Sequence, residues 1–565
     1  MNKYRPYPQI GLSERTWPSR IITAAPAWCS VDLRDGNQAL VNPMNPRQKM
    51  KYFKMLTKVG FKEIEVSFPA ASKADFDFTR ALIEQECVPE DVTIQVLTQA
   101  RAHLIDTTMQ AVRGAKRVIV HVYNSTSPAQ REIVFRKSPK EIISIAVDGV
   151  KMIRDQVGKV GGEVVLEYSP ESFSQTEVDF ACEICNEVIE AWSPDAGEAV
   201  MINLPSTVEV SSPNVYADQI EYVNRNLIMR ERVILSVHTH NDRGCAVAAA
   251  EMAQLAGAQR VEGTVFGNGE RTGNADLVTL ALNCFAQGIE TGLDFSDLAS
   301  IEEVYNECTG MQVPARHPYA GEYVFTAFSG SHQDAISKGL AHYRHNGGDW
   351  NVPYLPIDPC DVGKNYQAVI RINSQSGKGG AAYIMEQVFG FRLPKEMHPE
   401  FGRVVQALAD TKGAELSNAE VGDLFTSEFV NVKGKCNLIH AHCEDFNADL
   451  YQSSVKWKAE ISIDDQNKSI EGYGNGPVDA MVNALSISVA DVKVISYTEH
   501  SLGEGSDARA AAYVQLEKSG VRKFGVGVDT DISVASYKAL FSAVNRLAKE
   551  SENAMPKVSA EVASS

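Results

Sequence analysis

The chain has 565 residues, enough for roughly three to four domains, and its 44% hydrophobic and 22% charged residues are typical of globular proteins. The formal net charge of −18 argues against a nucleic-acid-binding surface as the main function. No apolar run of about 18 residues is present, so we expect no membrane span. The N-terminus lacks the apolar core of a signal peptide, and the ten cysteines follow no regular spacing. These features predict a reducing, cytoplasmic location.

The first 295 residues show a repeated pattern. Residues 1–25 are rich in Pro, Arg and aromatic side chains, and we expect an arm that lies on the body or on a partner subunit. In residues 26–295, apolar strand-like runs alternate with helical patterns. The strands are predicted at 27–33, 63–67, 93–98, 117–122, 163–168, 199–204, 233–237 and 261–265. The predicted helices include 47–59, 139–156, 177–190 and 214–229.

Eight continuous apolar strands that alternate with helices predict an α/β fold, a closed parallel (β/α)8 barrel, with a doubly wound open sheet as the alternative. In such a barrel, the active site lies at the C-terminal ends of the strands. Chemically capable side chains gather at these predicted ends. They are Arg34, Asp35, His121, Ser169, Glu171, Pro205, Thr207, His238 and His240, followed by the glycine-rich segment 267–274.

Two histidines at the end of the seventh strand indicate a metal site. His238 and His240 are two residues apart, so both side chains point the same way from an extended segment. Asp35 supplies a third ligand, and the amide oxygen of Asn274 is placed to complete the set. Arg34 beside it can stabilise a developing enolate or alkoxide. The alternative is a pair of hydrogen-bonded loop histidines with a structural Arg34–Asp35 ion pair.

Residues 296–430 have a different composition. Segments 347–361 and 373–380 are rich in Gly, Pro and Asn, which is typical of loops rather than of a packed core. We interpret the region as small helical linker subdomains that cover the barrel mouth, either of the same chain or of the partner in a homodimer. His332 and Tyr366 are its chemically interesting residues, although the sequence alone favours an ordinary structural role for each.

Residues 431–550 contain a weak internal repeat. In each half, strands end in a Gly-x-Gly and one helix follows, first across 469–485 and then across 522–547. Two such βββα modules predict a separate α+β domain, which suits a small effector bound at their interface. The tail, residues 551–565, is predicted to be disordered.

Two cysteine groups could be mistaken for metal sites. Cys182 and Cys185 lie in a helical pattern with no second pair to complete a tetrahedral zinc site, so we interpret them as structural. The denser group of Cys436, Cys443 and the histidines between them matches no common zinc module, and a structural zinc there is the less favoured reading.

Several motifs resemble a known enzyme group. The runs Arg34-Asp35-Gly36-Asn37-Gln38, His238-Thr239-His240-Asn241-Asp242 and Gly267-Asn268-Gly269-Glu270-Arg271 through Asn274 resemble the Claisen-condensing acyl-CoA enzymes of the DRE-TIM metallolyases. These three are shared with homocitrate and citramalate synthases, which remain the alternative. The matches Ser169-Pro170-Glu171, Asn203-Leu204-Pro205-Ser206-Thr207, VPYLPIDP and NSQSGKGG extend the resemblance over nearly the full length. With them, the chain is similar to the long form of the 2-isopropylmalate synthase family.

The resemblance implies a reaction and its ligands. Acetyl-CoA and 3-methyl-2-oxobutanoate, a 2-oxoacid, would condense with water to 2-isopropylmalate and CoA in a homodimer that leucine inhibits. A divalent metal is implied, Mg²⁺ first with Mn²⁺ or Zn²⁺ as alternatives, and K⁺ as a candidate activator. The implied metal ligands are Asp35, His238 and His240, with Asn274. Arg34, Glu171, Glu270, His332 and Tyr366 are the implied catalytic residues.

The remaining implied residues bind the substrate or the inhibitor. Arg34, Gln38, His121, Ser169, Pro205 and Thr207 would line the 2-oxoacid site. Leucine would bind at positions Gly474, Gly476, Val494, Tyr497, Ala508 and Ala510.

Two other classes remain open at this stage. A metal-dependent amidohydrolase on the same barrel would carry His-x-His on its first strand, where this chain has Arg34 and Asp35. A ligand-sensing protein without catalysis would explain residues 431–550 but would leave the polar strand ends unused.

Overall fold

The computed structural model describes residues 3, 7–192, 199–327, 330–364, 378–413, 416–449, 452–489, 492–503, 505 and 508–554. The chain divides into two compact units. One contains Met1–Val324 with Pro356–Lys364, and the other contains Phe325–Leu355 with Asn365–Ser565. Among the described residues, none of the helices combines the length and the apolar character needed to cross a membrane.

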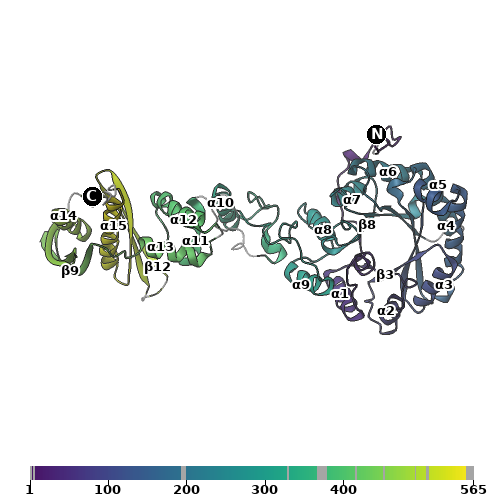
Figure 1. Ribbon diagram of the computed structural model, residues 1–565, viewed down its shortest axis with the longest axis horizontal. Coiled ribbons are helices and arrows are strands. Elements are labelled where there is room, and N and C mark those ends of the chain that lie inside the picture. The colour runs from purple at the N-terminus through teal and green to yellow at the C-terminus, as the bar shows by residue number, and fades with distance from the viewer. Residues whose placement is uncertain are drawn as a thin grey trace, which may run out of the picture. The chain divides into compact units, whose positions relative to one another are not determined.

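The first unit is a closed barrel of eight parallel strands in sequential order, which confirms the predicted fold. Its strands are β1 (Ala27–Ser30), β2 (Glu63–Ser67), β3 (Thr93–Gln99), β4 (Arg117–Ser125), β5 (Glu163–Glu171), β6 (Val200–Ser206), β7 (Val233–Thr239) and β8 (Arg260–Gly263). The helices surround them (Figure 1) and are α1 (Pro46–Val59), α2 (Lys73–Glu84), α3 (Ala102–Ala111), α4 (Pro139–Arg154), α5 (Val178–Trp192), α6 (Pro213–Asn226), α7 (Ala246–Leu255) and α8 (Leu277–Phe285).

Two differences from the predicted strands shape the C-terminal end of the barrel. The first strand stops at Ser30, and Asp32–Gly36 forms a π-helical turn (η2) that carries Arg34 and Asp35. Strands β4 and β5 continue three residues further than predicted, because Ser125 still pairs with Glu171. Arg34 and Asp35 therefore lie on a turn that follows the strand, and Glu171 is the last residue of β5.

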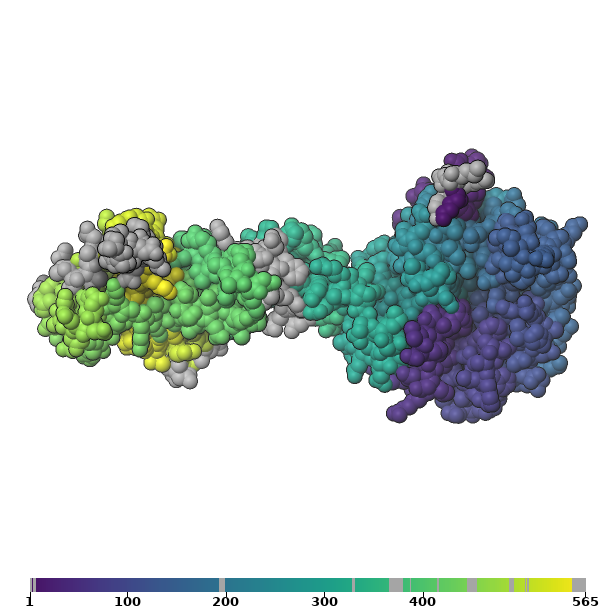
Figure 2. Space-filling view, in the orientation of Figure 1, coloured from purple at the N-terminus to yellow at the C-terminus, as the bar shows by residue number. Residues whose placement is uncertain are grey.

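The N-terminal segment lies against α6. The Arg15 guanidinium bonds to Asp218 at 2.7 Å, the Trp17 indole N–H donates to the same carboxylate at 2.9 Å, and the backbone N–H of Thr16 donates to Glu221 at 3.0 Å. Both carboxylates are buried. Figure 2 shows this purple segment against the teal surface of the barrel unit.

The second unit begins with helices and ends in two βββα modules. The helices are α10 (Gly330–Asn346), α11 (Lys378–Phe389), α12 (His398–Lys412) and α13 (Asn418–Phe429), while α9 (Leu298–Thr309) belongs to the barrel unit. The first module has β9 (Cys436–Asp449), β10 (Gln452–Ile463), β11 (Gln466–Gly474) and α14 (Pro477–Val489). The second has β12 (Lys493–Leu502), β13 (Arg509–Lys518), β14 (Val521–Asp529) and α15 (Ile532–Ala554). Each sheet is antiparallel, so the predicted duplication is confirmed.

The Gly-x-Gly of each module has a packing role. A Cβ atom at Gly474 would lie 2.3 Å from the backbone nitrogen of Ala480 on α14, and a Cβ atom at Gly527 would lie 1.9 Å from the carbonyl oxygen of Ala535 on α15. Such distances are far below van der Waals contact, so only glycine lets the helix backbone lie directly on the sheet. The two modules share one apolar core that includes Trp457 and Ala510.

The other face of the second sheet is covered by helices α11 to α13. Phe401, Phe425 and Phe429 of these helices pack with Tyr513 and Phe524 of the sheet. A buried ion pair joins α12 to α15, since Arg546 bonds to Glu400 at 2.6 Å. The helical subdomain and the C-terminal domain are therefore built around adjoining cores within one unit.

Candidate functional site

A cavity of about 370 Å³ lies at the C-terminal ends of the barrel strands. It brings together most of the site residues predicted for the barrel, from six of the eight strand ends. These residues are Arg34, Asp35, Gln38, His121, Ser169, Glu171, Pro205, Thr207, His238, His240 and Glu270. The lining also contains Asn203 and Arg271, which lie in the quoted motifs but were given no role, and Phe68, Leu97 and Tyr123, which sequence reasoning missed.

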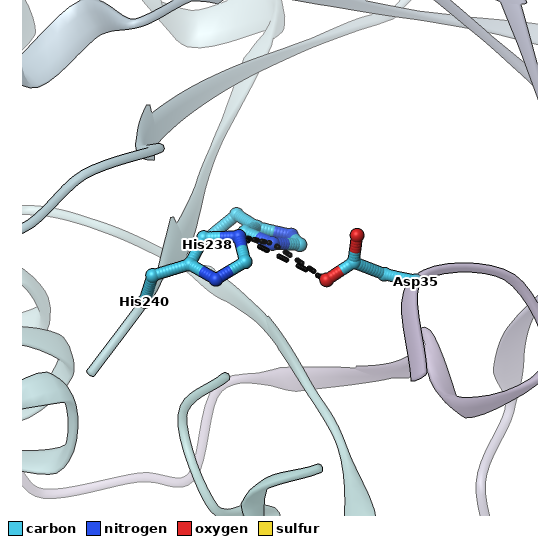
Figure 3. Close-up of side chains that lie close together, drawn as sticks. All are labelled: Asp35, His238 and His240. Carbon is cyan, nitrogen blue, oxygen red and sulfur yellow. Dashed lines mark hydrogen bonds and ion pairs between the residues drawn. The ribbon is translucent and has the colours of Figure 1, made fainter. Parts of the chain in front are cut away.

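Three of these side chains form a candidate metal site. The Nε2 atoms of His238 and His240 lie 3.3 Å apart, and each lies 3.8 Å from the Oδ2 atom of Asp35. Figure 3 shows the ring of His238 on β7 and the ring of His240, just after β7, facing the carboxylate of Asp35 on the η2 turn. All three residues are buried. Two imidazole nitrogens and a carboxylate oxygen directed at one point are a donor set that suits a divalent cation.

Asn274 supports the same site from the β8 loop. Its Nδ2 atom donates to the Asp35 carboxylate at 2.7 Å, while its Oδ1 atom is buried and has no hydrogen-bond partner among the described residues. A buried acceptor without a partner is costly unless something else satisfies it. A bound cation would satisfy it, so the residues present fit a metal ion.

The electrostatics keep the donors in their ligating forms. Burial lowers the pKa of His240 to about 4, and neighbouring His238 adds to the effect, so the ring is neutral at pH 7. Burial alone would raise the pKa of Asp35, but Arg34 and the two histidines lower it to about 2. A neutral imidazole and an ionised carboxylate are the forms that bind metal.

Arg34 is held between two carboxylates. Its Nη1 atom donates to Asp35 at 2.7 Å, and its Nε atom donates to buried Glu65 of β2. Glu65 in turn accepts from His121 at 3.0 Å, if that ring nitrogen carries the proton, and from Gln95 at 2.8 Å. The guanidinium is thus fixed in orientation beside the metal candidate, where negative charge on a substrate oxygen would develop.

A polar layer fills the barrel interior below the cavity, and sequence reasoning missed it. The carboxylate of Glu262 accepts from Gln95 and Arg260 at 2.9 Å each and from Asn203 at 3.1 Å. Its other contact is His238, whose Nδ1 atom lies 2.9 Å away. Arg260 is fully buried and outweighs the burial that would otherwise raise the pKa of Glu262, so this pKa is held well below its usual range. The sequence signal for this layer is a polar residue within each of several otherwise apolar strands.

The glycine-rich loop after β8 is fastened to two neighbouring loops. Arg271, which has a positive φ of 56°, bonds to Asp242 at 2.7 Å and donates to the carbonyl oxygen of Thr207. Asp242 also accepts from the backbone N–H of Glu209 at 2.9 Å. The loops after β6, β7 and β8 are therefore held together at the rim of the cavity.

Comparison with known proteins decides the family. The chain is 52% identical over 551 residues to the 2-isopropylmalate synthase of Clostridium acetobutylicum, covering 96% of this chain and 99% of that protein. It is 52% identical over 548 residues to the 2-isopropylmalate synthase of Rhizobium meliloti, covering 96% and 98%. The corresponding enzyme of Ralstonia nicotianae is 50% identical over 558 residues, covering 98% and 96%.

The chain belongs to the 2-isopropylmalate synthase family. Three family profiles match successive parts of it. Residues 25–304 match the HMGL-like family. Residues 322–386 match the alpha-isopropylmalate synthase, post-catalytic domain-like family, and residues 415–548 match the LeuA allosteric (dimerisation) domain. The family is one of acyltransferases, which confirms the enzyme class expected from the motifs.

The two catalytic candidates of the linker are not part of the described cavity. His332 lies on α10 in the second unit, where it is exposed and its ring centroid is 4.0 Å from that of Tyr354. Tyr366 and most of the NSQSGKGG motif lie outside the described residues. A role for either side chain at a barrel mouth stays a prediction.

The candidate leucine positions fall on both modules. Gly474 ends β11 and Gly476 precedes α14, whereas Val494 and Tyr497 lie on β12 and Ala510 is buried on β13. Ala508 lies just before β13. The backbone N–H of Asn475, between the two glycines, already donates to Asp479 at 2.9 Å. An effector carboxylate at this turn would therefore compete with that side chain.

The cysteine groups form no metal site among the described residues. Groups of three or more metal-binding side chains in that part of the chain are Asp35 with His238 and His240, and His121 with Glu167 and Glu262. The second group already encloses the Arg260 guanidinium, which bonds to Glu262. Neither includes Cys182, Cys185, Cys436 or Cys443, and all ten cysteines are free thiols.

Proposed function

We propose that the barrel condenses acetyl-CoA with 3-methyl-2-oxobutanoate and water to give 2-isopropylmalate and CoA, and that leucine bound to the C-terminal modules inhibits the reaction. The observation that carries the proposal is the convergence of Asp35, His238 and His240 with Arg34 in one cavity of a chain that belongs to this family. We assign Mg²⁺ as the metal, and the ten free thiols support a cytoplasmic location.

The residues of the cavity have distinct roles in this proposal. A bound divalent ion would polarise the keto group of the 2-oxoacid. Glu171, which lines the cavity, is the candidate base that removes a proton from the acetyl methyl group. The carbanion forms a bond to the keto carbon, and Arg34 stabilises the negative charge that moves to the keto oxygen. Water then cleaves the thioester, so that the carboxylic acid and the thiol of CoA are released.

The rest of the cavity would hold the 2-oxoacid. His121, Ser169 and Asn203 form a hydrogen-bonded group, since Ser169 Oγ lies 2.7 Å from His121 Nε2 and accepts from Asn203 at 3.0 Å. With Pro205 and Thr207, these side chains enclose the space beside the metal candidate. Gln38 and Glu270 also line the cavity. The Nε2 atom of Gln38 donates to Asp35 at 3.0 Å and lies 3.4 Å from the carboxylate of Glu270.

The test is release of thiol from acetyl-CoA in the presence of a panel of 2-oxoacids. We expect release that depends on a divalent ion, that is fastest with 3-methyl-2-oxobutanoate and that leucine decreases. His240→Ala should abolish it while the protein stays folded. Release with pyruvate alone would instead indicate a citramalate synthase, and release with 2-oxoglutarate alone a homocitrate synthase. No release with any 2-oxoacid would favour a ligand-sensing protein without catalysis.

We also propose a homodimer whose linker regions complete the active sites, with His332 and Tyr366 as acid–base groups. The matching dimerisation-domain family supports the dimer. Mixing an Arg34→Ala protein with a His332→Ala protein tests the sharing of sites. Mixed dimers regain part of the activity if the sites are shared between subunits, and no recovery after proven subunit exchange would contradict the proposal.

A further inference from the structure

A histidine outside the active-site cavity joins the segment before the second unit to the loop after β8. Residues 314–324, here called the linker strap, follow α9 and end where the chain enters the second unit at Phe325. In this strap, the Nε2 atom of His317 lies 3.2 Å from the Oδ2 atom of Asp276, which caps the start of α8. The two side chains are only 10% and 11% exposed. No step of the proposed reaction uses this pair.

The surroundings of His317 favour its charged form. Its Nδ1 atom lies 3.0 Å from the carbonyl oxygen of Pro318, and its Nε2 atom faces Asp276. A carbonyl oxygen and a carboxylate only accept hydrogen bonds, so both ring nitrogens must carry a proton to bond to them. Burial alone would lower the pKa of His317, but Asp276 and the backbone groups of Pro318 and Phe266 raise it overall. The pair is therefore a charge-assisted hydrogen bond, which is stronger than a neutral one.

The ring of His317 also packs against a strained residue of the loop after β8. Phe266 is buried and has a positive φ of 60°. A bulky side chain rarely adopts this backbone conformation, which persists only where the surrounding structure enforces it. The centroid of the Phe266 ring lies 5.5 Å from that of His317 and 5.1 Å from that of Tyr305 on α9, both edge to face. The linker strap and α9 therefore hold the loop in its strained conformation.

This strained conformation lies next to the backbone that positions Asn274. The carbonyl oxygen of Gly267, the residue after Phe266, accepts from the backbone N–H of Asn274 at 3.0 Å. The side chain of Asn274 in turn donates to the Asp35 carboxylate at 2.7 Å. A continuous series of contacts therefore runs from His317, through the loop after β8, to the candidate metal site.

The linker strap has a defined fold of its own. The backbone N–H of Gly321 donates to the carbonyl oxygen of His317 at 2.9 Å, and a Cβ atom at Gly321 would lie 2.6 Å from the carbonyl oxygen of Ala315. The Lys364 ammonium donates to the carbonyl oxygen of Ala320 at 2.9 Å. These contacts fix the position of His317, so a displacement of the strap would move its ring away from the loop after β8.

We propose that His317 is a positioning residue for the metal site and couples the order of the linker strap to the affinity for the divalent cation. The ion pair with Asp276 and the ring contact with Phe266 hold the loop so that Asn274 faces Asp35. Such coupling is reciprocal: loosening of the strap weakens metal binding, and a bound metal makes the strap more ordered. Because the chain enters the second unit through the strap, the linker region gains a route to act on the barrel site. The inference depends on the metal site and not on the identity of the 2-oxoacid.

Binding of Mn²⁺ to the full-length protein, followed by electron paramagnetic resonance, is the first test. We expect His317→Ala to weaken this binding by about tenfold, a size typical of coupling between sites. His317→Gln keeps a donor for Asp276 but not the charge, so its affinity should be intermediate. The matched control is His103→Ala, which removes an imidazole from an exposed position on α3 and should keep the wild-type affinity. Wild-type Mn²⁺ affinity in a His317→Ala protein that has only lost stability would overturn the proposal.

Hydrogen exchange of the wild-type protein tests the reverse direction and needs no variant. Saturating Mn²⁺ should slow the exchange of the Gly321 and Tyr323 amides, which are hydrogen-bonded within the strap, by about the same tenfold factor. The amides of α3 should exchange at the same rate with and without the ion. Equal exchange of the strap amides in both conditions would overturn the coupling. Slower exchange in a protein that releases no thiol with any 2-oxoacid would support the coupling and contradict only the proposed reaction.

Discussion

His238 Nδ1 lies 2.9 Å from Glu262 Oε2 inside the barrel, so the ring presents its other nitrogen, Nε2, to Asp35 and His240. Glu262 is itself fixed by Arg260 at 2.9 Å and is fully buried. A carboxylate behind a ligating histidine sets the ring tautomer and its orientation. Glu262 is therefore a positioning residue for the metal candidate.

Glu262→Gln should weaken metal binding by about 10- to 100-fold, because the amide removes the negative charge that holds the Nδ1 proton. Binding of Mn²⁺ followed by electron paramagnetic resonance measures this directly. Glu167→Gln is the control, since Glu167 is buried in the same layer and lies 3.4 Å from Arg260. Equal Mn²⁺ affinities in the two folded variants would contradict the role of Glu262.

The packing of the modules predicts a contrast between two nearby glycines. Gly474→Ala should destabilise the first module by about 1–3 kcal/mol, since its Cβ atom would lie 2.3 Å from Ala480 N. Gly476→Ala meets no atom within 4 Å and should be nearly neutral for stability. Hydrogen exchange of the α14 amides reports the difference. Equal protection of α14 in both variants would refute the packing role.

Ala510 allows a test of the leucine positions. Ala510 is buried at the shared core of the modules, so Ala510→Val fills space there. We expect leucine to bind the variant more weakly in calorimetry and to inhibit it less. In the wild type, excess substrate should not relieve the inhibition by leucine, because the two ligands bind at separate sites. Ala407→Val, at an exposed position of α12, is the control and should keep full inhibition. Normal leucine binding by Ala510→Val would show that the pocket lies elsewhere.

The stability of the barrel should depend on pH through Asp32. Burial raises the pKa of Asp32 to about 7, although Ser30, Val265 and Tyr52 donate hydrogen bonds to it. The unfolded chain has the ordinary value of about 3.9. The folded state therefore binds a proton that the unfolded state lacks between these values, and the stability from Asp32 is complete below about pH 4 and is lost as the pH rises through about 7.

Asp32→Asn removes this titration. The free energy of unfolding, measured by denaturant between about pH 5 and pH 8, should fall less steeply with pH in the variant than in the wild type. Identical slopes would show that Asp32 is already ionised in the folded protein across this range.

The sequence was sufficient to predict the barrel and the metal candidate, because both depend on local patterns. Strand ends of a parallel barrel meet at one face, so Asp35, His238 and His240 could be brought together without coordinates. The internal repeat likewise predicted the two modules. The predicted end of the first strand, at residue 33, was wrong, because an apolar run does not reveal that the strand stops at Ser30 and a π-helical turn follows.

Other features depend on contacts that single-sequence patterns do not carry. Glu262 and Gln95 are polar residues within otherwise apolar strands, and only barrel closure shows that the two side chains meet, with Gln95 donating to Glu262 at 2.9 Å. Gly474 was predicted as one of the leucine-binding positions, whereas its packing on α14 follows from a three-dimensional approach of helix and sheet. The sharing of His332 between subunits depends on an assembly that the sequence of one chain does not specify.

The most direct test of the central claim is identification of the product by mass spectrometry, with simultaneous measurement of free CoA. Acetyl-CoA, 3-methyl-2-oxobutanoate and Mg²⁺ should give 2-isopropylmalate and CoA in equal amounts, and chelation of the metal should stop both. CoA release without 2-isopropylmalate, or equal rates with and without the divalent ion, would contradict the account.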